Sequence, residues 1–216
     1  MKHDLMKGAA NLLRRVVDVL ASSLVLIVLS PLLVVVAAAI AIESQGPPIY
    51  KASRVGQGGR KFLMWKFRTM VSGASRMGPA ITGKNDRRIT RLGAILRKTK
   101  IDELPQFVNV LLGDMTLVGP RPEAPEIVDL YTPAQLPVLA ARPGITGVVQ
   151  LHSGEESESI PEGVDAGEFY IGHLLGQKIR ADLDYLEKRT LFSDGQVLLQ
   201  TVMYVLRASV RQPFRR

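Results

Sequence analysis

The longest apolar stretch of the chain lies near its N-terminus. Residues Val19 to Ile42 include no charged side chain, and as one continuous helix they would be about 36 Å long, more than the roughly 30 Å hydrocarbon core of a bilayer. The stretch is longer than the apolar part of a typical signal peptide, and its bulky Leu and Ile side chains do not resemble a cleavage site. The pattern predicts that residues 1–45 form an uncleaved membrane segment.

A proline interrupts this segment. Pro31 lacks a backbone donor and clashes with the preceding turn, so the pair Ser30-Pro31 predicts a bend. Both flanks are basic, and the positive-inside rule is satisfied on both sides if the chain returns to the side from which it entered. We therefore predict a re-entrant helix broken at Ser30-Pro31, with a proline-kinked spanning helix as the alternative. The basic residues are Lys2, Lys7, Arg14 and Arg15 before the segment, and Lys51, Arg54, Arg60, Lys61, Lys66 and Arg68 after it.

Residues 46–216 show the pattern of an α/β domain that is mostly helical. β-favouring residues near Ile49 and from Phe62 to Phe67 flank a glycine-rich stretch, which predicts a small β-hairpin closed by a plain turn. Leu92, Ile95 and Leu96 form the apolar stripe of a predicted helix. The C-terminal segment predicts an amphipathic helix that lies at the bilayer interface or, alternatively, packs in the core before a solvated tail. It contains Leu198, Leu199, Val202, Val205 and Leu206, followed by Arg207, Arg211, Arg215 and Arg216.

The charge of the chain favours an anionic partner. It has 28 Lys and Arg against 20 Asp and Glu, a formal net charge of +8, which suits phospholipid headgroups or a phosphorylated substrate. There are no cysteines, which excludes disulfides and thiolate metal sites, and the three histidines are too scattered to suggest a zinc site. Aromatic residues make up only 6% of the chain, so together with the membrane segment the composition predicts no nucleic acid partner.

Two adjacent carboxylates, Asp102 and Glu103, precede an apolar helical stretch. Because Pro105 fits only the first turn of a helix, we expect this helix to begin near Asp102, where the helix dipole favours ionised carboxylates. An ordinary N-cap is the simpler interpretation of such a pair. The basic residues around it favour a second interpretation, in which they hold a polyanion against the pair. They are Lys84, Arg87, Arg88, Arg91, Arg97, Lys98 and Lys100.

This combination is typical of phosphoryl transfer. An anionic nucleophile that attacks a diphosphate needs a divalent cation and basic side chains to neutralise the phosphates. An Asp can supply the nucleophile and form an acyl phosphate, while a neighbouring Glu handles protons or orients the metal. Asp102 and Glu103 are therefore candidates for two separate catalytic roles.

Three motifs are specific enough to indicate a family. They are KFRTM at residues 66–70, DELPQFVNVLLGDMTLVGPRPE at residues 102–123 and RPGITGVVQ at residues 142–150. Together they closely resemble the bacterial sugar transferase family, the small monotopic phosphoglycosyl transferases. The resemblance implies a polyprenyl-phosphate sugar-1-phosphate transferase of the bacterial inner membrane, with a catalytic domain, residues 46–216, on the cytoplasmic face and a re-entrant membrane helix.

The activity implied by the resemblance is the first membrane step of a glycoconjugate pathway. A sugar 1-phosphate moves from a nucleotide diphosphate sugar, usually UDP-linked, to a polyprenyl phosphate, and UMP is released in a ping-pong mechanism. Asp102 would carry the covalent phosphosugar and bind Mg²⁺, with Glu103 as its partner. The resemblance places Pro120-Arg121-Pro122 near the nucleotide, and Lys66 and Arg68 could face a phosphate together if they alternate on one strand. The substrate-binding candidates are Lys66, Arg68, Arg88, Pro120, Arg121, Pro122 and Arg142.

One departure from the family pattern follows Gln150. Family members usually continue with Asn-Gly-Arg-Asn, whose Arg is thought to bind a substrate phosphate, whereas this chain has Gly154 at the Arg position. An acidic insertion near residues 153–168 follows, and its composition favours a solvated loop. Our hypothesis is that Arg142 or Lys178 replaces the missing phosphate contact and that the insertion shapes a distinct sugar pocket.

A second class of function explains the charge and the membrane segment equally well. In that class the chain is a catalytically silent, membrane-anchored module that binds polyanions. It gives no reason for Asp102 and Glu103 within a long family motif, and it predicts that Asp102→Asn has no effect. The sequence leaves open the sugar, the polyprenyl acceptor, the pathway and whether the chain forms a homodimer.

Overall fold

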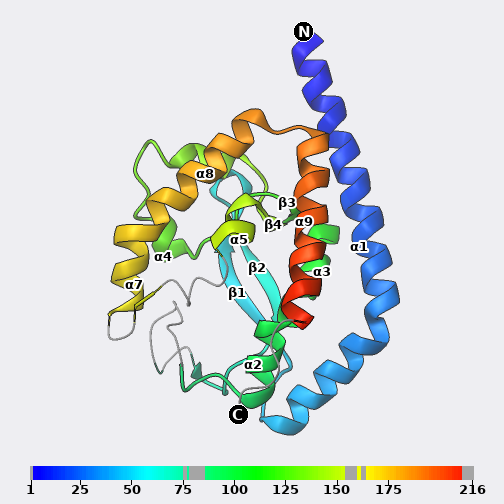
Figure 1. The fold of residues 1–216 in the computed structure, drawn as a ribbon, viewed down its shortest axis with the longest axis vertical. Helices are drawn as coiled ribbons and strands as arrows, with labels where there is room; N and C mark the ends of the chain where they lie inside the picture. Colours follow the sequence, from blue (N-terminus) through cyan, green and yellow to red (C-terminus); the bar gives the residue numbers. More distant parts are fainter. Residues whose placement is uncertain (1, 75–76, 78–85, 154–159, 162–163, 211–216) are drawn as a thin grey trace.

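One helix, α1 (Lys2–Glu43), runs along the side of all the other elements in this computed structural model (Figure 1). The structure describes every residue except 1, 75–76, 78–85, 154–159, 162–163 and 211–216. After α1 come β1 (Ile49–Val55), β2 (Lys61–Phe67), α2 (Arg91–Lys98), α3 (Gln106–Leu112), β3 (Thr116–Val118), α4 (Pro125–Val128), β4 (Gly144–Thr146), α5 (Val148–Ser153), α7 (Ala166–Phe169), α8 (Leu175–Lys188) and α9 (Leu191–Val210).

Two pairs of strands lie between the helices. Strands β1 and β2 form an antiparallel hairpin with Ile49 opposite Phe67, and its turn contains glycines with φ of 68° and 77°, so the predicted hairpin and plain turn are confirmed. Strands β3 and β4 pair in parallel, with Thr116 opposite Gly144. The sequence did not reveal this second pair, because three-residue strands are too short to show an alternating pattern.

Helix α1 continues through Pro31. A proline here leaves the carbonyl of Ile27 without its helical donor, and the hydroxyl of Ser30 donates to that carbonyl at 2.8 Å. The predicted interruption at Ser30-Pro31 is therefore not a break in the helix, because the side chain of Ser30 replaces the lost bond. The helix bends toward its C-terminal end in Figure 1, but a single continuous helix does not itself establish a re-entrant course.

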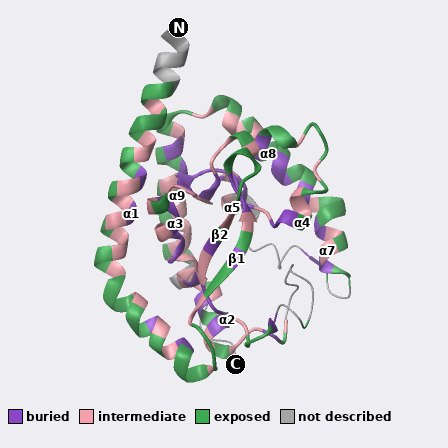
Figure 2. Ribbon diagram, turned by 180° about the vertical axis from the view of Figure 1, so that it is seen from behind, coloured by how far each residue is buried: buried purple, intermediate pink, exposed green. Residues whose placement is uncertain are grey.

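The surface of α1 fits membrane anchoring. Among the described residues it is the one helix that is long and apolar enough to cross a membrane, and only 11% of its most apolar window is buried. A core helix of a soluble protein would be mostly buried. Ile27 is 72% exposed and Val34 is 68% exposed, and Figure 2 shows exposed and half-buried positions along most of the helix.

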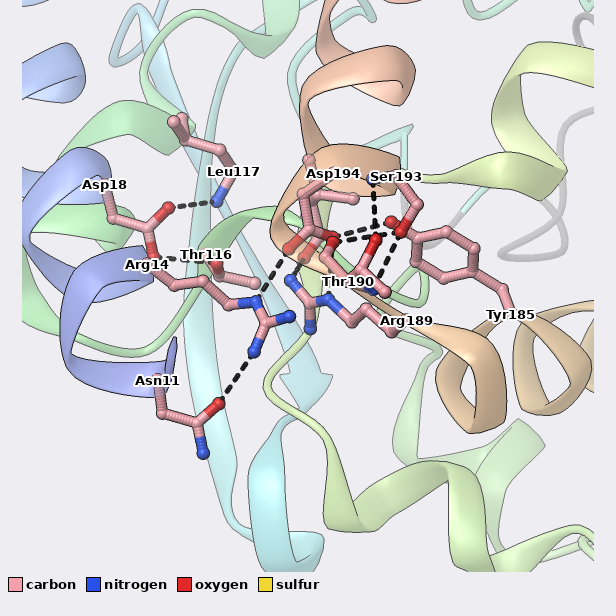
Figure 3. Close-up of polar contacts among 11 residues, drawn as sticks. Asn11, Arg14, Asp18, Thr116, Leu117, Tyr185, Arg189, Thr190, Ser193 and Asp194 are labelled. Atoms are coloured by element: carbon pink, nitrogen blue, oxygen red, sulfur yellow. Dashed lines mark hydrogen bonds and ion pairs between the residues drawn. The ribbon is translucent and has the colours of Figure 1, made fainter. Parts of the chain in front are cut away.

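Two residues one turn apart in α1, Arg14 and Asp18, bind α9 and β3 through buried carboxylates. Asp18, which is buried, accepts hydrogen bonds from the hydroxyl of Thr116 at 2.7 Å and from the backbone N–H of Leu117 at 3.0 Å. Arg14 donates through Nε to Asp194 of α9 at 2.7 Å, as Figure 3 shows. These contacts fix α1 to β3 and to the N-terminal end of α9.

Two arginines cap helix ends where α1 meets the domain. Arg15 donates to the carbonyl oxygens of Val110 at 2.5 Å and Leu111 at 2.9 Å, near the end of α3. Arg68, just after β2, donates to the carbonyl oxygens of Gln45 at 2.9 Å and Ser44 at 2.7 Å, beyond the end of α1. A cation at a helix C-terminus satisfies unpaired carbonyls and opposes the helix dipole, so α1 and the domain stabilise each other.

Apolar packing joins the same elements. Leu96 of α2 lies in a buried cluster with Phe67 of β2 and with Val36 and Ile40 of α1, and Leu92 packs against it. The predicted apolar stripe is thus confirmed at these two positions of α2, whereas Ile95 is 39% exposed. In α9, Val197 is buried, whereas Leu199, Val202 and Leu206 are 65%, 56% and 57% exposed. The predicted amphipathic C-terminal helix is therefore present, and its exposed apolar side fits a bilayer interface.

Candidate active site

The Asp102-Glu103 pair lies in a short 3₁₀ turn, Ile101–Glu103, between α2 and α3. Helix α3 begins at Gln106 with Pro105 as its N-cap, so the predicted helix start near Asp102 is too early. Pro105 has no N–H to donate to the carbonyl of Ile101, and the N–H of Leu104 bonds to that carbonyl instead, so this stretch forms a 3₁₀ turn. Lys100, with φ of 58° and ψ of 14°, separates the turn from α2. A residue with left-handed backbone cannot continue a right-handed helix, and for a residue other than glycine it costs roughly 1–2 kcal/mol.

Asp102 is the buried member of the pair. It is 7% exposed, and within the described part of the chain its Oδ1 is buried without a hydrogen-bond partner. Burial and the adjacent charge of Glu103 raise the pKa of Asp102 to about 6, although Lys66, Lys100 and Arg97 oppose the rise. The environment therefore differs from the predicted helix N-terminus, because desolvation outweighs the surrounding positive charge.

Glu103 is held by two cations. Its Oε1 accepts a hydrogen bond from the amine of Lys66 at 2.8 Å and lies 3.3 Å from a guanidinium nitrogen of Arg121. Burial opposes ionisation, but the charges of Lys66 and Arg121 outweigh it and hold the pKa of Glu103 well below its usual range. The structure thus brings together four of the residues that the sequence singled out, Lys66, Asp102, Glu103 and Arg121.

Other predicted binding residues have different partners. Arg68 does not share a strand face with Lys66, because β2 ends at Phe67 and the Arg68 guanidinium turns to the end of α1. Arg88 is buried and pairs with Asp86 at 2.6 Å, and it also donates to the carbonyl of Ala74.

The remaining predicted binding residues, Pro120-Arg121-Pro122 and Arg142, lie on two neighbouring segments. Pro120 and Pro122 are buried on either side of half-buried Arg121, and the carbonyl of Pro120 accepts a bond from the N–H of Gly144 at 2.9 Å. This bond places the segment of half-buried Arg142 beside the Pro120-Arg121-Pro122 element. Gly154 and half of the acidic insertion, residues 154–159 and 162–163, lie outside the described residues.

The sequence did not predict a buried polar cluster that Glu123, Tyr170 and Lys178 form near Arg121. The Tyr170 hydroxyl, on a residue only 1% exposed, donates to Oε1 of Glu123 and accepts from the amine of Lys178 at 2.6 Å. Arg121, Lys178 and Asp182 line one cavity of about 30 Å³. Lys178 therefore has partners within this cluster, and its proposed phosphate contact stays a prediction. Spacing on α8 was the available signal, because residues 178 and 182 lie one turn apart.

Asp182 makes the stability of the fold depend on pH. Burial raises its pKa to about 7, with Glu123 adding to the rise and Lys178 opposing it. The folded chain then binds more protons than the unfolded chain between about pH 4 and pH 7, so stability falls as the pH rises through that window. The asparagine of Asp182→Asn cannot titrate, so this variant should not lose stability in that window. From pH 5 to pH 8 we expect its free energy of unfolding to rise by on the order of 2 kcal/mol relative to that of the wild type.

Thermal unfolding of detergent-solubilised protein at pH 5 and pH 8 checks this expectation. Asp184→Asn, at an exposed position of the same helix, is the matched control and should show no such gain. An Asp182→Asn advantage that is equal at both pH values would contradict the assignment.

The pair offers oxygen ligands for a divalent cation. No cluster of three or more His, Asp or Glu side chains that could hold a metal ion occurs among the described residues. Mg²⁺ is commonly bound by one or two carboxylates, with water and substrate phosphates completing its shell. The unpartnered Oδ1 of Asp102 fits such a site.

Known families and proteins match most of this chain. The sequence model of the family described as bacterial sugar transferase matches residues 9–208. The chain is 41% identical over 202 residues to UDP-glucose:undecaprenyl-phosphate glucose-1-phosphate transferase of Caulobacter vibrioides, covering 92% of this chain and 71% of that protein. It is 36% identical over 197 residues to UDP-N-acetylgalactosamine-undecaprenyl-phosphate N-acetylgalactosaminephosphotransferase of Aeromonas hydrophila, covering 90% of this chain and 44% of that protein.

A third relative extends the comparison to another organism. The chain is 32% identical over 200 residues to UDP-glucose:undecaprenyl-phosphate glucose-1-phosphate transferase of Escherichia coli strain K12, covering 91% of this chain and 41% of that protein. The matched region therefore spans less than half of the length of the Aeromonas and Escherichia proteins.

Proposed function

The chain belongs to the bacterial sugar transferase family, and on this premise we propose that it transfers a sugar 1-phosphate from a UDP-sugar to a polyprenyl phosphate with release of UMP. The names of the relatives support this donor and acceptor, since they combine UDP-glucose or UDP-N-acetylgalactosamine with undecaprenyl phosphate. These relatives differ in their sugar, so the proposal is not restricted to one.

The contrast between the two carboxylates carries the proposal. Glu103 is fixed by Lys66 and Arg121, whereas Asp102 keeps a buried oxygen without a protein partner in the described chain. An oxygen that accepts no hydrogen bond is more nucleophilic than one that does, and a carboxyl pKa of about 6 still leaves it mostly ionised at pH 7 to 8. Asp102 is therefore our candidate nucleophile, and Glu103 is its fixed partner.

The proposed reaction has two displacements at one phosphorus. An oxygen of Asp102 forms a bond to the phosphorus that bears the sugar, the bond from that phosphorus to the bridging oxygen breaks, and UMP leaves with the electron pair. An oxygen of the polyprenyl phosphate then bonds to the same phosphorus and displaces the Asp102 carboxylate. Splitting one difficult transfer into two steps is the usual advantage of covalent catalysis.

Positive charge near the pair would reduce repulsion between Asp102 and the donor. Lys66 and Arg121 lie at the dyad, and Arg121 can give a planar, two-pronged contact to a phosphate or to uridine. Mg²⁺ held by Asp102 would neutralise further phosphate charge when bound. Pro120 and Pro122 restrict the backbone on both sides of Arg121, which reduces the entropy lost when the donor binds.

The experiment uses purified protein in lipid nanodiscs with Mg²⁺ and a panel of UDP-sugars, without polyprenyl phosphate. We expect the intact mass to rise by one sugar phosphate with one donor of the panel, together with release of UMP. If folded protein yields neither adduct nor UMP with any UDP-sugar, the proposal is wrong for these donors, and a binding module for polyanions becomes the better account.

We also propose that α1 is re-entrant, with both of its ends and the domain on the cytoplasmic face. The basic flanks and the bend of α1 support this course. The chain has no cysteine, so Gly8→Cys and Gln45→Cys each provide one label site at an end of the helix. A membrane-impermeant maleimide should label both in inverted vesicles and neither in intact spheroplasts. Labelling of the two ends from opposite sides would establish a spanning helix instead.

A further inference from the structure

Lys100 occupies a position where glycine is the usual residue. Within the described ranges it is the one residue other than glycine with a positive φ. It directly follows Thr99, the C-cap of α2, and its N–H donates to the carbonyl of Arg97 at 3.1 Å. This bond is typical of a helix that ends in a left-handed residue, and glycine is favoured there because it has no Cβ. The backbone alone therefore gives no reason for a lysine.

The same position starts the turn that carries the carboxylates. The carbonyl of Lys100 accepts from the N–H of Glu103 at 3.2 Å, so Lys100 closes the turn that holds both carboxylates. The charge of Lys100 accordingly acts on both carboxyl groups and favours their ionised forms. The side chain is half-buried, so its charge is incompletely screened by water.

The two other cations at the Asp102-Glu103 pair bind Glu103 directly. Lys66 and Arg121 both contact the same oxygen of Glu103. The charge of Lys66 also acts on Asp102, but its hydrogen bond holds it at Glu103, so a diphosphate that approaches Asp102 benefits from further positive charge there. Lys100, two residues before Asp102 in the same turn, is placed to provide it.

We propose that Lys100 is a further substrate-binding residue, whose ammonium contacts the diphosphate of the sugar nucleotide while Asp102 attacks it. The inference rests on the proposed function. It explains why a lysine stands in a left-handed position that glycine would occupy with less strain. Strained residues are often retained at functional sites because the side chain is needed there.

Three substitutions separate the charge of Lys100 from its backbone. Lys100→Gly removes the charge and relaxes the turn, Lys100→Asn removes the charge but still tolerates the left-handed backbone, and Lys100→Arg keeps both the charge and the strain. Lys188→Asn, at an exposed lysine in the last turn of α8, controls for the loss of one positive charge. Release of UMP at varied UDP-sugar concentration gives kcat and KM, and thermal unfolding gives Tm.

We expect kcat/KM to fall roughly ten- to hundredfold in Lys100→Gly and Lys100→Asn, the range for loss of one charged hydrogen bond. The loss should appear mainly in KM, since the contact already exists in the ground state. Lys100→Arg should keep most of the activity, and Lys188→Asn should match the wild type. Lys100→Gly should also raise Tm by about 2–4 °C as strain is relieved, so its lower activity could not be assigned to unfolding.

Wild-type kcat/KM in Lys100→Gly would overturn the inference, because glycine preserves the turn and removes the ammonium. Loss of activity in Lys100→Asn alone would show that the backbone matters rather than the charge, and would overturn it too. A wild-type protein that releases no UMP from any donor refutes the proposed function, and the role of Lys100 falls with it. If the wild type is active and the Lys100 variants have the same kcat/KM, only the proposed role of Lys100 is refuted.

Discussion

Asp102→Asn is expected to lower the rate of UMP release roughly a thousandfold or more, the scale found when a covalent nucleophile is removed. An amide oxygen has nearly the shape of the carboxylate oxygen but is a far weaker nucleophile, so the phosphosugar adduct should not form. Donor binding should be much less affected, because the cations around Glu103 remain in place. Intact mass and UMP release measure the two parts of this expectation.

The buried position of Asp102 distinguishes this result from simple unfolding. Burial raises its carboxyl pKa, so a neutral side chain should leave Tm unchanged or higher. Glu126→Gln, at an exposed carboxylate in the first turn of α4, is the control and should keep full activity. An Asp102→Asn protein that still forms the adduct would place the nucleophile elsewhere.

Asp194→Ala is expected to have the largest effect on stability, because one buried carboxylate holds three partners. Its oxygens accept from Arg14 at 2.7 Å, from Arg189 at 2.7 Å and from the Tyr185 hydroxyl at 2.6 Å, and Figure 3 shows these side chains converging on it from α1 and the end of α8. Alanine would leave two guanidinium groups without their counter-ion. Removing one partner of a buried charge cluster typically destabilises a protein by about 3–5 kcal/mol.

Thermal unfolding should show this loss as a fall in Tm of about 10 °C or more. Asp194→Asn keeps the acceptor oxygen and should lose less, while Asp129→Ala, at an exposed carboxylate, should stay within about 0.5 kcal/mol of the wild type. A small change in Asp194→Ala would mean that the two arginines find water or other acceptors when the carboxylate is removed.

Local patterns predicted those parts of the fold that local forces determine. The hairpin follows from β-favouring residues on either side of the glycine turn, and the apolar stripe of α2 follows from helical spacing. The role of Asp18 could not be predicted, because a single carboxylate near an apolar stretch looks the same whether it faces water or β3. Its partners, Thr116 and Leu117, are almost a hundred residues away in sequence.

The candidate site was predictable in composition but not in environment. The motif identified Asp102, Glu103 and Arg121, and the structure places them together with Lys66. The burial of Asp102 depends on tertiary packing, which outweighs the local dipole argument, so the sequence predicted the wrong surroundings for this pair. Lys100 was noticed only as one of several basic residues, because a left-handed backbone leaves no signal in a lysine.

The caps supplied by α1 also affect how the enzyme can be handled in water. A truncated protein without residues 1–45 would lose Arg15 from the end of α3 and Asp18 from β3, so it should misfold rather than become a soluble catalyst. Solubility is better sought by polar substitutions at exposed positions such as Leu24, Ile27 and Val34, with Arg15 and Asp18 left in place. Such a protein would keep the α1 residues that contact the domain but would no longer bind to the bilayer.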